Sequence, residues 1–205
     1  MTETLRHHEA AVGAMFDHAS PEHVRTLIDL YRAYLLEEAD RTREHASGIP
    51  VSTWLQTLMV SINGTPAAFC SVDLGRLAVE LVYVSPEFRG HGVAAWLLRE
   101  LARTCPGQLS IKAPLSPAGA ALAARAGLTV DLPTQEQQAV GEQAQREMRN
   151  AIEKQCRHRR TGDPRAVCRR CLRTLLTRSA EAHVMAYVAM ARLADQMFTP
   201  GRSPR

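Results

Sequence analysis

A buried strand that leads into a glycine-rich loop and then into a helix is the feature that most limits how this chain can fold. Residues 77–84 are almost continuously apolar, as in a strand buried on both faces of a sheet. Pro86 ends this strand, and a loop through Arg89 and Gly92 leads to a helical pattern over residues 92–103. Backbone N–H groups converge at such a helix start, where the helix dipole adds positive potential. The segment therefore predicts a binding site for a pyrophosphate group.

The residues around this segment predict a mixed α/β fold. Residues 58–62 and 67–74 flank Asn63 and Gly64, which both tolerate the positive φ of a two-residue hairpin turn. Together with residues 77–84, these two strands predict an antiparallel meander. Three more strands are expected at residues 11–18, 109–113 and 128–132, and two more helices at residues 21–35 and 118–125. The expected architecture is a mixed, mostly antiparallel sheet flanked by helices.

The glycine-rich loop also matches the pattern of a known family. Arg89, Gly92 and Ala94 have the spacing of an arginine, two residues, a glycine, one residue, and a glycine or alanine. Val84 and Pro86 match the usual exit of the preceding strand. On these residues the chain resembles the GNAT superfamily of N-acyltransferases over residues 20–132. The resemblance implies the GNAT fold for a domain of residues 1–133.

The resemblance further implies that acetyl-CoA is the co-substrate and lies between the strands at residues 77–84 and 109–113. Backbone groups of Val82 and Val84 would then pair with the pantetheine arm. The pyrophosphate would contact the loop and helix start, and Ser116 would contribute from the start of the next helix. The loop residues assigned to the cofactor are Arg89, Gly90, His91, Gly92, Val93 and Ala94. For His91, simple exposure to solvent is an equally good interpretation.

Glu80 is the candidate general base, because relatives often carry a carboxylate on the strand before the loop. It is the only acidic residue of residues 77–84, and a charge inside an apolar strand costs free energy unless it is solvated or paired. The alternative is that Glu80 points outward or forms an ordinary ion pair. The usual tyrosine acid is replaced by Ala123, and Tyr83 could substitute only if a bulge turns it inward.

Residues 134–205 are expected to form a small helical extension that contains a metal site. Cys156, His158, Cys168 and Cys171 form a CxH…CxxC set, and thiolates with imidazole suit a structural zinc ion. His183 is an alternative fourth ligand in place of His158. The competing interpretation is that these residues are free thiols and a surface histidine in a basic helix.

The charge distribution separates the two parts of the chain. Residues 1–145 contain 11 basic and 16 acidic residues, whereas residues 146–205 contain 14 and 5. The basic extension makes nucleic acid a candidate partner, although an ordinary solvated surface is the favoured interpretation. No run reaches the roughly 18 apolar residues of a membrane helix, and the first residues lack an apolar signal segment, so no membrane association and a cytoplasmic location are expected.

Two classes of function follow from these observations. The first is an N-acyltransferase that transfers an acetyl group from acetyl-CoA to a primary amine of a small molecule or a protein. The alternative is a zinc-containing nucleic-acid-binding or regulatory protein whose GNAT domain only senses acyl-CoA. A homodimer is one further expectation, because an apolar stripe in the last helix could pack either on the body of the protein or on a second subunit.

Overall fold

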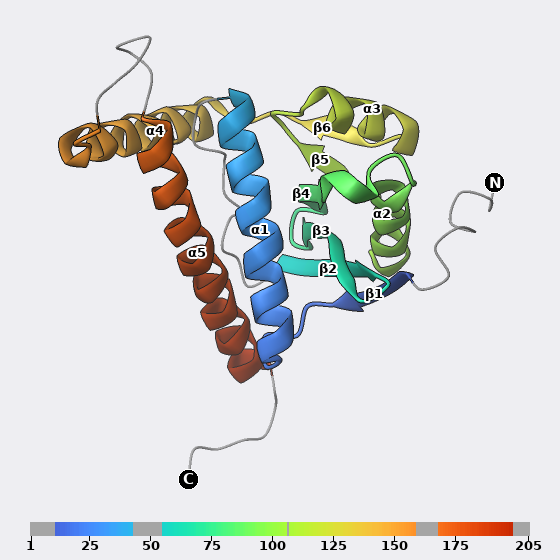
Figure 1. Ribbon diagram of the computed structural model, residues 1–205. Helices are drawn as coiled ribbons and strands as arrows, with labels where there is room; N and C mark the ends of the chain where they lie inside the picture. Colours follow the sequence, from blue (N-terminus) through green and yellow to red (C-terminus); the bar gives the residue numbers. More distant parts are fainter. Residues whose placement is uncertain (1–10, 43–54, 106, 159–167, 199–205) are drawn as a thin grey trace.

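The computed structural model describes residues 11–42, 55–105, 107–158 and 168–198 (Figure 1). One six-stranded sheet has the strand order β1-β2-β3-β4-β5-β6, antiparallel from β1 to β4 and parallel from β4 to β6. The strands are β1 (Ala11–Met15), β2 (Leu55–Ile62), β3 (Thr65–Asp73), β4 (Ala78–Val84), β5 (Ser110–Lys112) and β6 (Thr129–Asp131). The predicted mixed, mostly antiparallel sheet is confirmed.

Five α-helices and one 3₁₀ turn accompany the sheet in the described residues. They are α1 (Pro21–Thr42), η1 (Pro86–Phe88), α2 (Val93–Thr104), α3 (Pro117–Ala126), α4 (Gln135–Gln155) and α5 (Arg169–Phe198). Helix α1 begins at the predicted proline, and α3 ends at Gly127, whose φ of 65° and backbone N–H bonds to the last turn make it the C-cap. Within the described residues, no helix is long and apolar enough to cross a bilayer.

The two turns of the meander follow from local sequence. Asn63 and Gly64 have φ values of 51° and 76°, and they join β2 to β3 in the predicted hairpin. The second turn is longer than predicted, because Leu77 has a φ of 51° and cannot continue an extended strand. The side chain of Asp73 stabilises this turn by accepting from the backbone N–H of Gly75 at 2.8 Å. Strand β4 therefore begins one residue after the predicted position.

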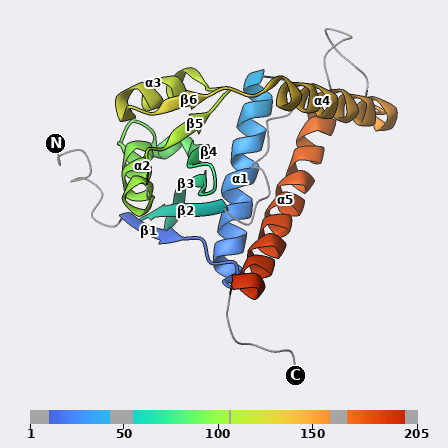
Figure 2. The ribbon, with the colours of Figure 1, turned by 180° about the vertical axis from the view of Figure 1, so that it is seen from behind.

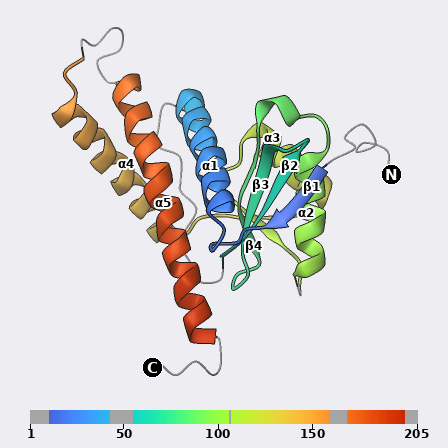
Figure 3. The same cartoon turned by 60° about the horizontal axis from the view of Figure 1, so that its bottom comes forward.

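The sheet lies between two helical layers. Helices α2 and α3 cover one face, and α1 covers the other, with α5 packed outside α1 (Figures 1 and 3). The buried side of α2 contacts a core of aliphatic residues from β2, β3 and β4. Its buried residues are Val93, Leu97, Leu98 and Leu101. Seen from behind, the same arrangement leaves α4 beside the start of α5 and away from the sheet (Figure 2).

Helix α5 shares its hydrophobic core with α1 and the sheet. Tyr187 is buried, stacks on Phe16 with ring centroids 5.1 Å apart, and donates from its hydroxyl to the carbonyl of Leu55 at 2.9 Å. The same core receives Leu172, Leu176, Ala180 and Val184 from α5, and Met148 and Ile152 from α4. The C-terminal helices thus cover part of the sheet and α1, and the division of the chain at residue 133 stays a prediction.

Candidate functional site

Strands β4 and β5 pair only at their first residues. Ala78 pairs with Ser110 and Val79 with Ile111, and β4 then continues to Val84 without a partner on that side. A β-bulge coincides with the end of pairing, because Val72 of β3 pairs with Val79 whereas the neighbouring Ser71 pairs with Leu81. Glu80 is therefore an extra residue in β4, and such a residue bends its strand.

The register of β4 places the backbone groups of Val82 and Val84 on this unpaired side. The N–H of Ser85 donates to the carbonyl of Ala67 at 2.8 Å, so these opposing residues are a hydrogen-bonded pair. In an antiparallel ladder, hydrogen-bonded pairs alternate with non-bonded ones. The N–H and C=O groups of Val82 and Val84 therefore point away from β3. Both residues predicted to contact the pantetheine arm thus offer their backbone groups where a ligand could pair.

The glycine-rich loop ends at the start of α2. Gly90 and Gly92 have φ values of 80° and 77°, a conformation that favours glycine, and Gly92 is the N-cap of the helix. The side chain of Val93 is only 3% exposed and anchors the first turn in the core. Ala94 follows in that turn, and His91 is exposed. The loop residues predicted from the sequence therefore lie together at a helix N-terminus, where backbone N–H groups suit an anion.

The side chain of Arg89 lies against β4 and α1. Its Nε donates to the carbonyl of Val84 at 2.9 Å, and one terminal nitrogen donates to Glu37 of α1 at 2.6 Å. Its guanidinium carbon lies 5.8 Å from the centroid of the Tyr83 ring. The hydrogen bond to Glu37 raises the pKa of Arg89 further. The arginine is thus held as a cation beside a carboxylate and an aromatic ring.

The bulge at Glu80 turns Tyr83 toward α1 and away from α2. Tyr83 packs against Tyr34 with ring centroids 6.0 Å apart and against Phe69 at 6.1 Å. Burial raises the pKa of the Tyr83 hydroxyl, and the charge of Glu37 raises it further. Tyr83 therefore keeps its proton and forms one wall of the Arg89 environment.

Glu80 forms the ion pair that was the alternative to the base assignment. Its side chain is fully buried, and its carboxylate accepts from Arg76 and, at 2.9 Å, from Nζ of Lys112. Lys112 belongs to β5, so this ion pair joins β4 to β5 just beyond their last paired residues. Both carboxylate oxygens are engaged in this conformation, and the role of Glu80 as a base stays a prediction.

The start of α3 has a structural explanation. Ser116 is its N-cap, and the hydroxyl accepts from the backbone N–H of Gly119 at 3.1 Å. Ala123, at the place of the usual tyrosine, is 2% exposed and faces the core between α3 and the sheet. This position therefore supplies no proton donor. Contact of Ser116 with the cofactor stays a prediction.

The predicted metal ligands lie together between α4 and α5. The ligand atoms of Cys156, His158, Cys168 and Cys171 all lie within 4.8 Å of one another. Nδ1 of His158 is 3.7 Å from Sγ of Cys156, 3.7 Å from that of Cys168 and 3.3 Å from that of Cys171. Ligands at usual zinc distances around a tetrahedron are about 3.5 Å apart. The four residues therefore fit a metal ion of this kind.

His183 is not part of this cluster. Its ring lies 5.1 Å from that of Tyr31, further along α5. All five cysteines are free thiols, so no disulfide competes with the cluster. Cys156 follows the last turn of α4, and its N–H donates to the carbonyl of Ile152 at 2.8 Å. Cys168 precedes α5, and its backbone carbonyl accepts from the N–H of Leu172 at 2.9 Å.

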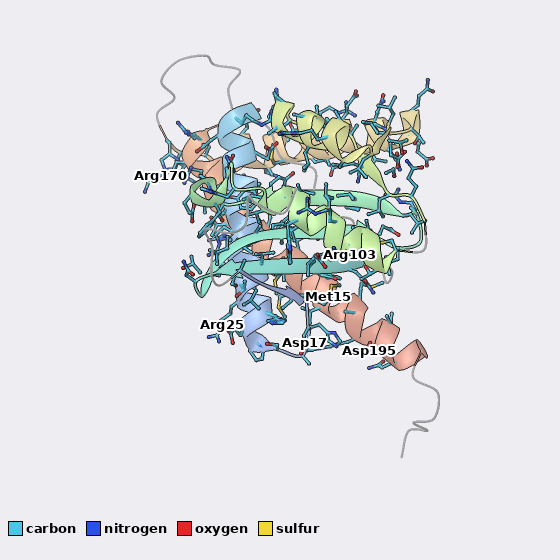
Figure 4. The ribbon with its side chains drawn as sticks, turned by 90° about the vertical axis from the view of Figure 1, so that its right-hand side faces the viewer. Met15, Asp17, Arg25, Arg103, Arg170 and Asp195 are labelled. Atoms are coloured by element: carbon cyan, nitrogen blue, oxygen red, sulfur yellow. The ribbon has the colours of Figure 1, made fainter. Side chains whose placement is uncertain are left out.

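Asp40 of α1 connects the cluster to the sheet domain. Its carboxylate accepts from Arg169 at 2.9 Å and from Arg173 at 2.8 Å, and the hydrogen bond from Arg169 lowers the pKa of this carboxyl. Two arginines of the basic extension are therefore engaged in intramolecular ion pairs, although both are exposed, as is Arg170 at the same end of α5 (Figure 4). The arginines at 159, 160 and 165 lie outside the described residues.

Comparison with known families decides the assignment. Residues 14–122 match the model of the acetyltransferase (GNAT) family, which covers more than half of the chain. The chain belongs to the GNAT acetyltransferase family. The sequence resemblance over residues 20–132 is thereby confirmed, and acyl transfer is the activity that this family supports.

Solved structures similar to this GNAT chain include acetyltransferases with low sequence identity. A predicted acetyltransferase from Clostridium acetobutylicum, solved with acetyl-CoA, is 15% identical, with 62% of this chain and 93% of that chain covered and a TM-score of 0.43. The ribosomal-protein-alanine N-acetyltransferase from Brucella melitensis biovar Abortus 2308 is 16% identical, with coverages of 75% and 98% and a TM-score of 0.35. None of the curated proteins compared with the chain matches it. The family model therefore carries the assignment.

Sequence reasoning missed Glu37 and Lys112. Each meets its partner across a long stretch of chain, since Glu37 is 52 residues from Arg89 and Lys112 is 32 residues from Glu80. Glu37 lies in a charged part of α1 that resembles an ordinary solvated helix face. Only the packing of α1 across β4 reveals its place beside the loop.

Proposed function

We propose that this GNAT protein is an N-acetyltransferase that uses acetyl-CoA and acetylates a primary amine of a small molecule or a protein. The observation that carries the proposal is the combination of the unpaired part of β4 with the glycine loop at the start of α2. The first offers backbone groups to an amide-containing arm, and the second offers N–H groups to a pyrophosphate. The pantetheine arm and the pyrophosphate of one coenzyme A molecule would thus have suitable partners along one path.

The reaction needs a neutral amine and a leaving thiolate. The amine nitrogen attacks the thioester carbonyl, a C–N bond forms, the C–S bond breaks, and the thiolate leaves. The amine nitrogen loses a proton to a base, and we assign this role to Glu80. One oxygen of Glu80 would first have to be released from Arg76 or Lys112, which the bulge and the partial exposure of both cations allow. A thiolate can leave without a general acid, which accommodates Ala123.

We also propose that Cys156, His158, Cys168 and Cys171 hold a structural zinc ion. All four positions of a tetrahedral site are filled by protein ligands, so the ion would have no open position for chemistry. It would fix the end of α4 against the start of α5, while Asp40 ties the same point to α1. The helical extension would then be a permanent part of the enzyme that presents the acceptor or a partner.

Nucleic-acid binding and a homodimer remain predictions. Neither the family assignment nor the contacts of the described residues favour them, since Arg169 and Arg173 are paired with Asp40. The function of an acyl-CoA sensor without transfer is also not favoured by the family.

Isothermal titration with acetyl-CoA tests the proposal. The wild-type chain should bind in the micromolar range, and Arg89→Glu should weaken binding at least tenfold because it places a carboxylate beside the pyrophosphate. Arg103→Glu is the matched control, since Arg103 is exposed near the C-terminal end of α2, far from the loop that precedes this helix (Figure 4). It should leave the affinity within about twofold.

Two outcomes would contradict the proposal. If the wild-type chain does not bind acetyl-CoA, the loop is not a coenzyme A site. If both arginine variants weaken binding equally, a general charge effect replaces the specific loop contact. Binding that is lost only at Arg89 justifies screening amines for acetylation.

A further inference from the structure

Arg89 occupies a site that belongs to residues of α1 and β4. Glu37 supplies a carboxylate at 2.6 Å, and Tyr83 supplies a ring at 5.8 Å. Tyr34 stands edge-on to the Tyr83 ring and closes the same environment. A carboxylate beside an aromatic face is a suitable environment for any ammonium or guanidinium group. Arg89 is therefore an internal cation in a site that could accept an external one.

The exposure of these groups shows that the site meets solvent at its carboxylate end. The side chain of Glu37 is 37% exposed and that of Arg89 is 45% exposed. Tyr83 is 6% exposed and Tyr34 is half-buried, so the aromatic side of the site belongs to the packed interior. A ligand cation could therefore replace Arg89 at Glu37 without any rearrangement of the core.

Acyl-CoA would compete for the contacts that now hold Arg89. The carbonyl of Val84 lies on the unpaired side of β4, where the pantetheine arm is proposed to pair, and Nε of Arg89 now occupies it. The pyrophosphate would attract the same guanidinium toward the helix start, because an arginine forms charge-assisted pairs with phosphate oxygens. Arrival of acyl-CoA would thus remove the arginine from Val84 and Glu37 together.

We propose that Glu37 and Tyr83 form the subsite for a cationic group of the acceptor, and that Arg89 fills this subsite until acyl-CoA draws it away. The inference rests on the proposed function. It specifies the acceptors as amines that carry a second positive charge besides the reacting nitrogen. It also sets an order of binding, in which acyl-CoA precedes the acceptor.

The test uses Glu37→Gln, which keeps the shape of the side chain and removes its charge. Glu38→Gln is the matched control, because Glu38 is the next residue of α1 and pairs with Arg41 instead. Free coenzyme A replaces acetyl-CoA in the titrations, so that no turnover occurs. The acceptor probe is 1,4-diaminobutane, and 1-butanol is the control with the same carbon chain and no charge.

Two results are expected. Glu37→Gln should bind coenzyme A about 2- to 5-fold more tightly than wild type, because no ion pair with Arg89 must be broken. Wild type should bind 1,4-diaminobutane at least tenfold more tightly when saturated with coenzyme A than without it, and Glu37→Gln should lose this gain. The uncharged 1-butanol should show no gain, and Glu38→Gln should behave as wild type in every titration.

The outcomes separate this inference from the function on which it rests. If wild type fails to bind coenzyme A, both are overturned. If coenzyme A binds but Glu37→Gln leaves its affinity and the diamine titration unchanged, only the subsite is overturned. Diamine binding that is equally tight without coenzyme A would contradict the exchange of Arg89.

Discussion

Truncation of Leu176 tests whether α5 and the GNAT sheet unfold as one unit. Leu176 is fully buried in the core that also contains Leu27 and Tyr31 of α1. Replacement of a fully buried leucine by alanine costs about 2–5 kcal/mol, because transfer free energy is lost and a cavity remains. With a urea m-value of about 2 kcal/mol/M, Leu176→Ala should lower the urea midpoint by about 1–2.5 M.

The assay is urea unfolding followed by far-UV circular dichroism and by tryptophan fluorescence. The chain has two tryptophans, so Trp54 is replaced by phenylalanine in every protein compared. Trp96 packs on the opposite face of the sheet from α5, so its fluorescence then reports on the part of the core that Leu176 does not touch. The urea midpoints from both signals should fall by the same amount. Thr177→Ala is the control, because the neighbouring Thr177 is exposed and its loss should change stability by no more than about 0.5 kcal/mol.

A separation of the two signals would refute this reasoning. If Leu176→Ala lowers only the circular dichroism midpoint, α5 unfolds by itself and the chain contains two independent units. The predicted boundary at residue 133 would then describe a real division in stability, and not only a change in sequence character.

Three further predictions concern the metal, the base and the tyrosines. Native mass spectrometry should find one zinc ion per chain, and Cys171→Ser should lose the ion and lower the Tm, whereas Cys105→Ser should keep the ion. Glu80→Gln should lower kcat at least a hundredfold while the free energy of unfolding falls by only about 1–3 kcal/mol, and an unchanged pH profile of kcat would exclude it as the base. Burial raises the pKa of Tyr34 and Tyr187 above the usual value of about 10. The stability that these neutral hydroxyls contribute should therefore be fully present below pH 10 and be lost as the pH rises above it. Tyr187→Phe should reduce that alkaline loss in urea midpoints measured from pH 8 to 11, and an equally steep loss would contradict the assignment.

Local chemistry made much of the fold predictable. The turn at Asn63 and Gly64 depends on two adjacent residues, and the C-cap at Gly127 depends on one, so both follow from the sequence alone. The cluster of Cys156, Cys168 and Cys171 was predicted for a similar reason, because each half of the CxH…CxxC set places two ligands within a few residues of each other. The choice of fourth ligand, by contrast, needed the position of α5 in space.

Long-range packing explains what sequence reasoning could not reach. An amphipathic helix such as α5 shows that it has a buried face but does not show which surface it covers. The same limit applies to Glu37, whose charge predicts solvent contact until α1 is placed beside β4. The one-residue error at the start of β4 arose because Leu77 adopts a positive φ that its residue type does not suggest.

The extra residue in β4 fixes the orientation of everything that follows it in that strand. Because successive side chains alternate between faces, one added residue exchanges the faces of all later ones. Val79 and Val82 accordingly face the α2 side, and Leu81 and Tyr83 face the α1 side. Deletion of residue 80 would restore simple alternation from Val79 and leave Tyr83 on the α1 side, whereas pairing Glu80 into a regular ladder would move every later side chain to the opposite face. The place of Glu80 outside the ladder therefore keeps the tyrosine beside the loop arginine.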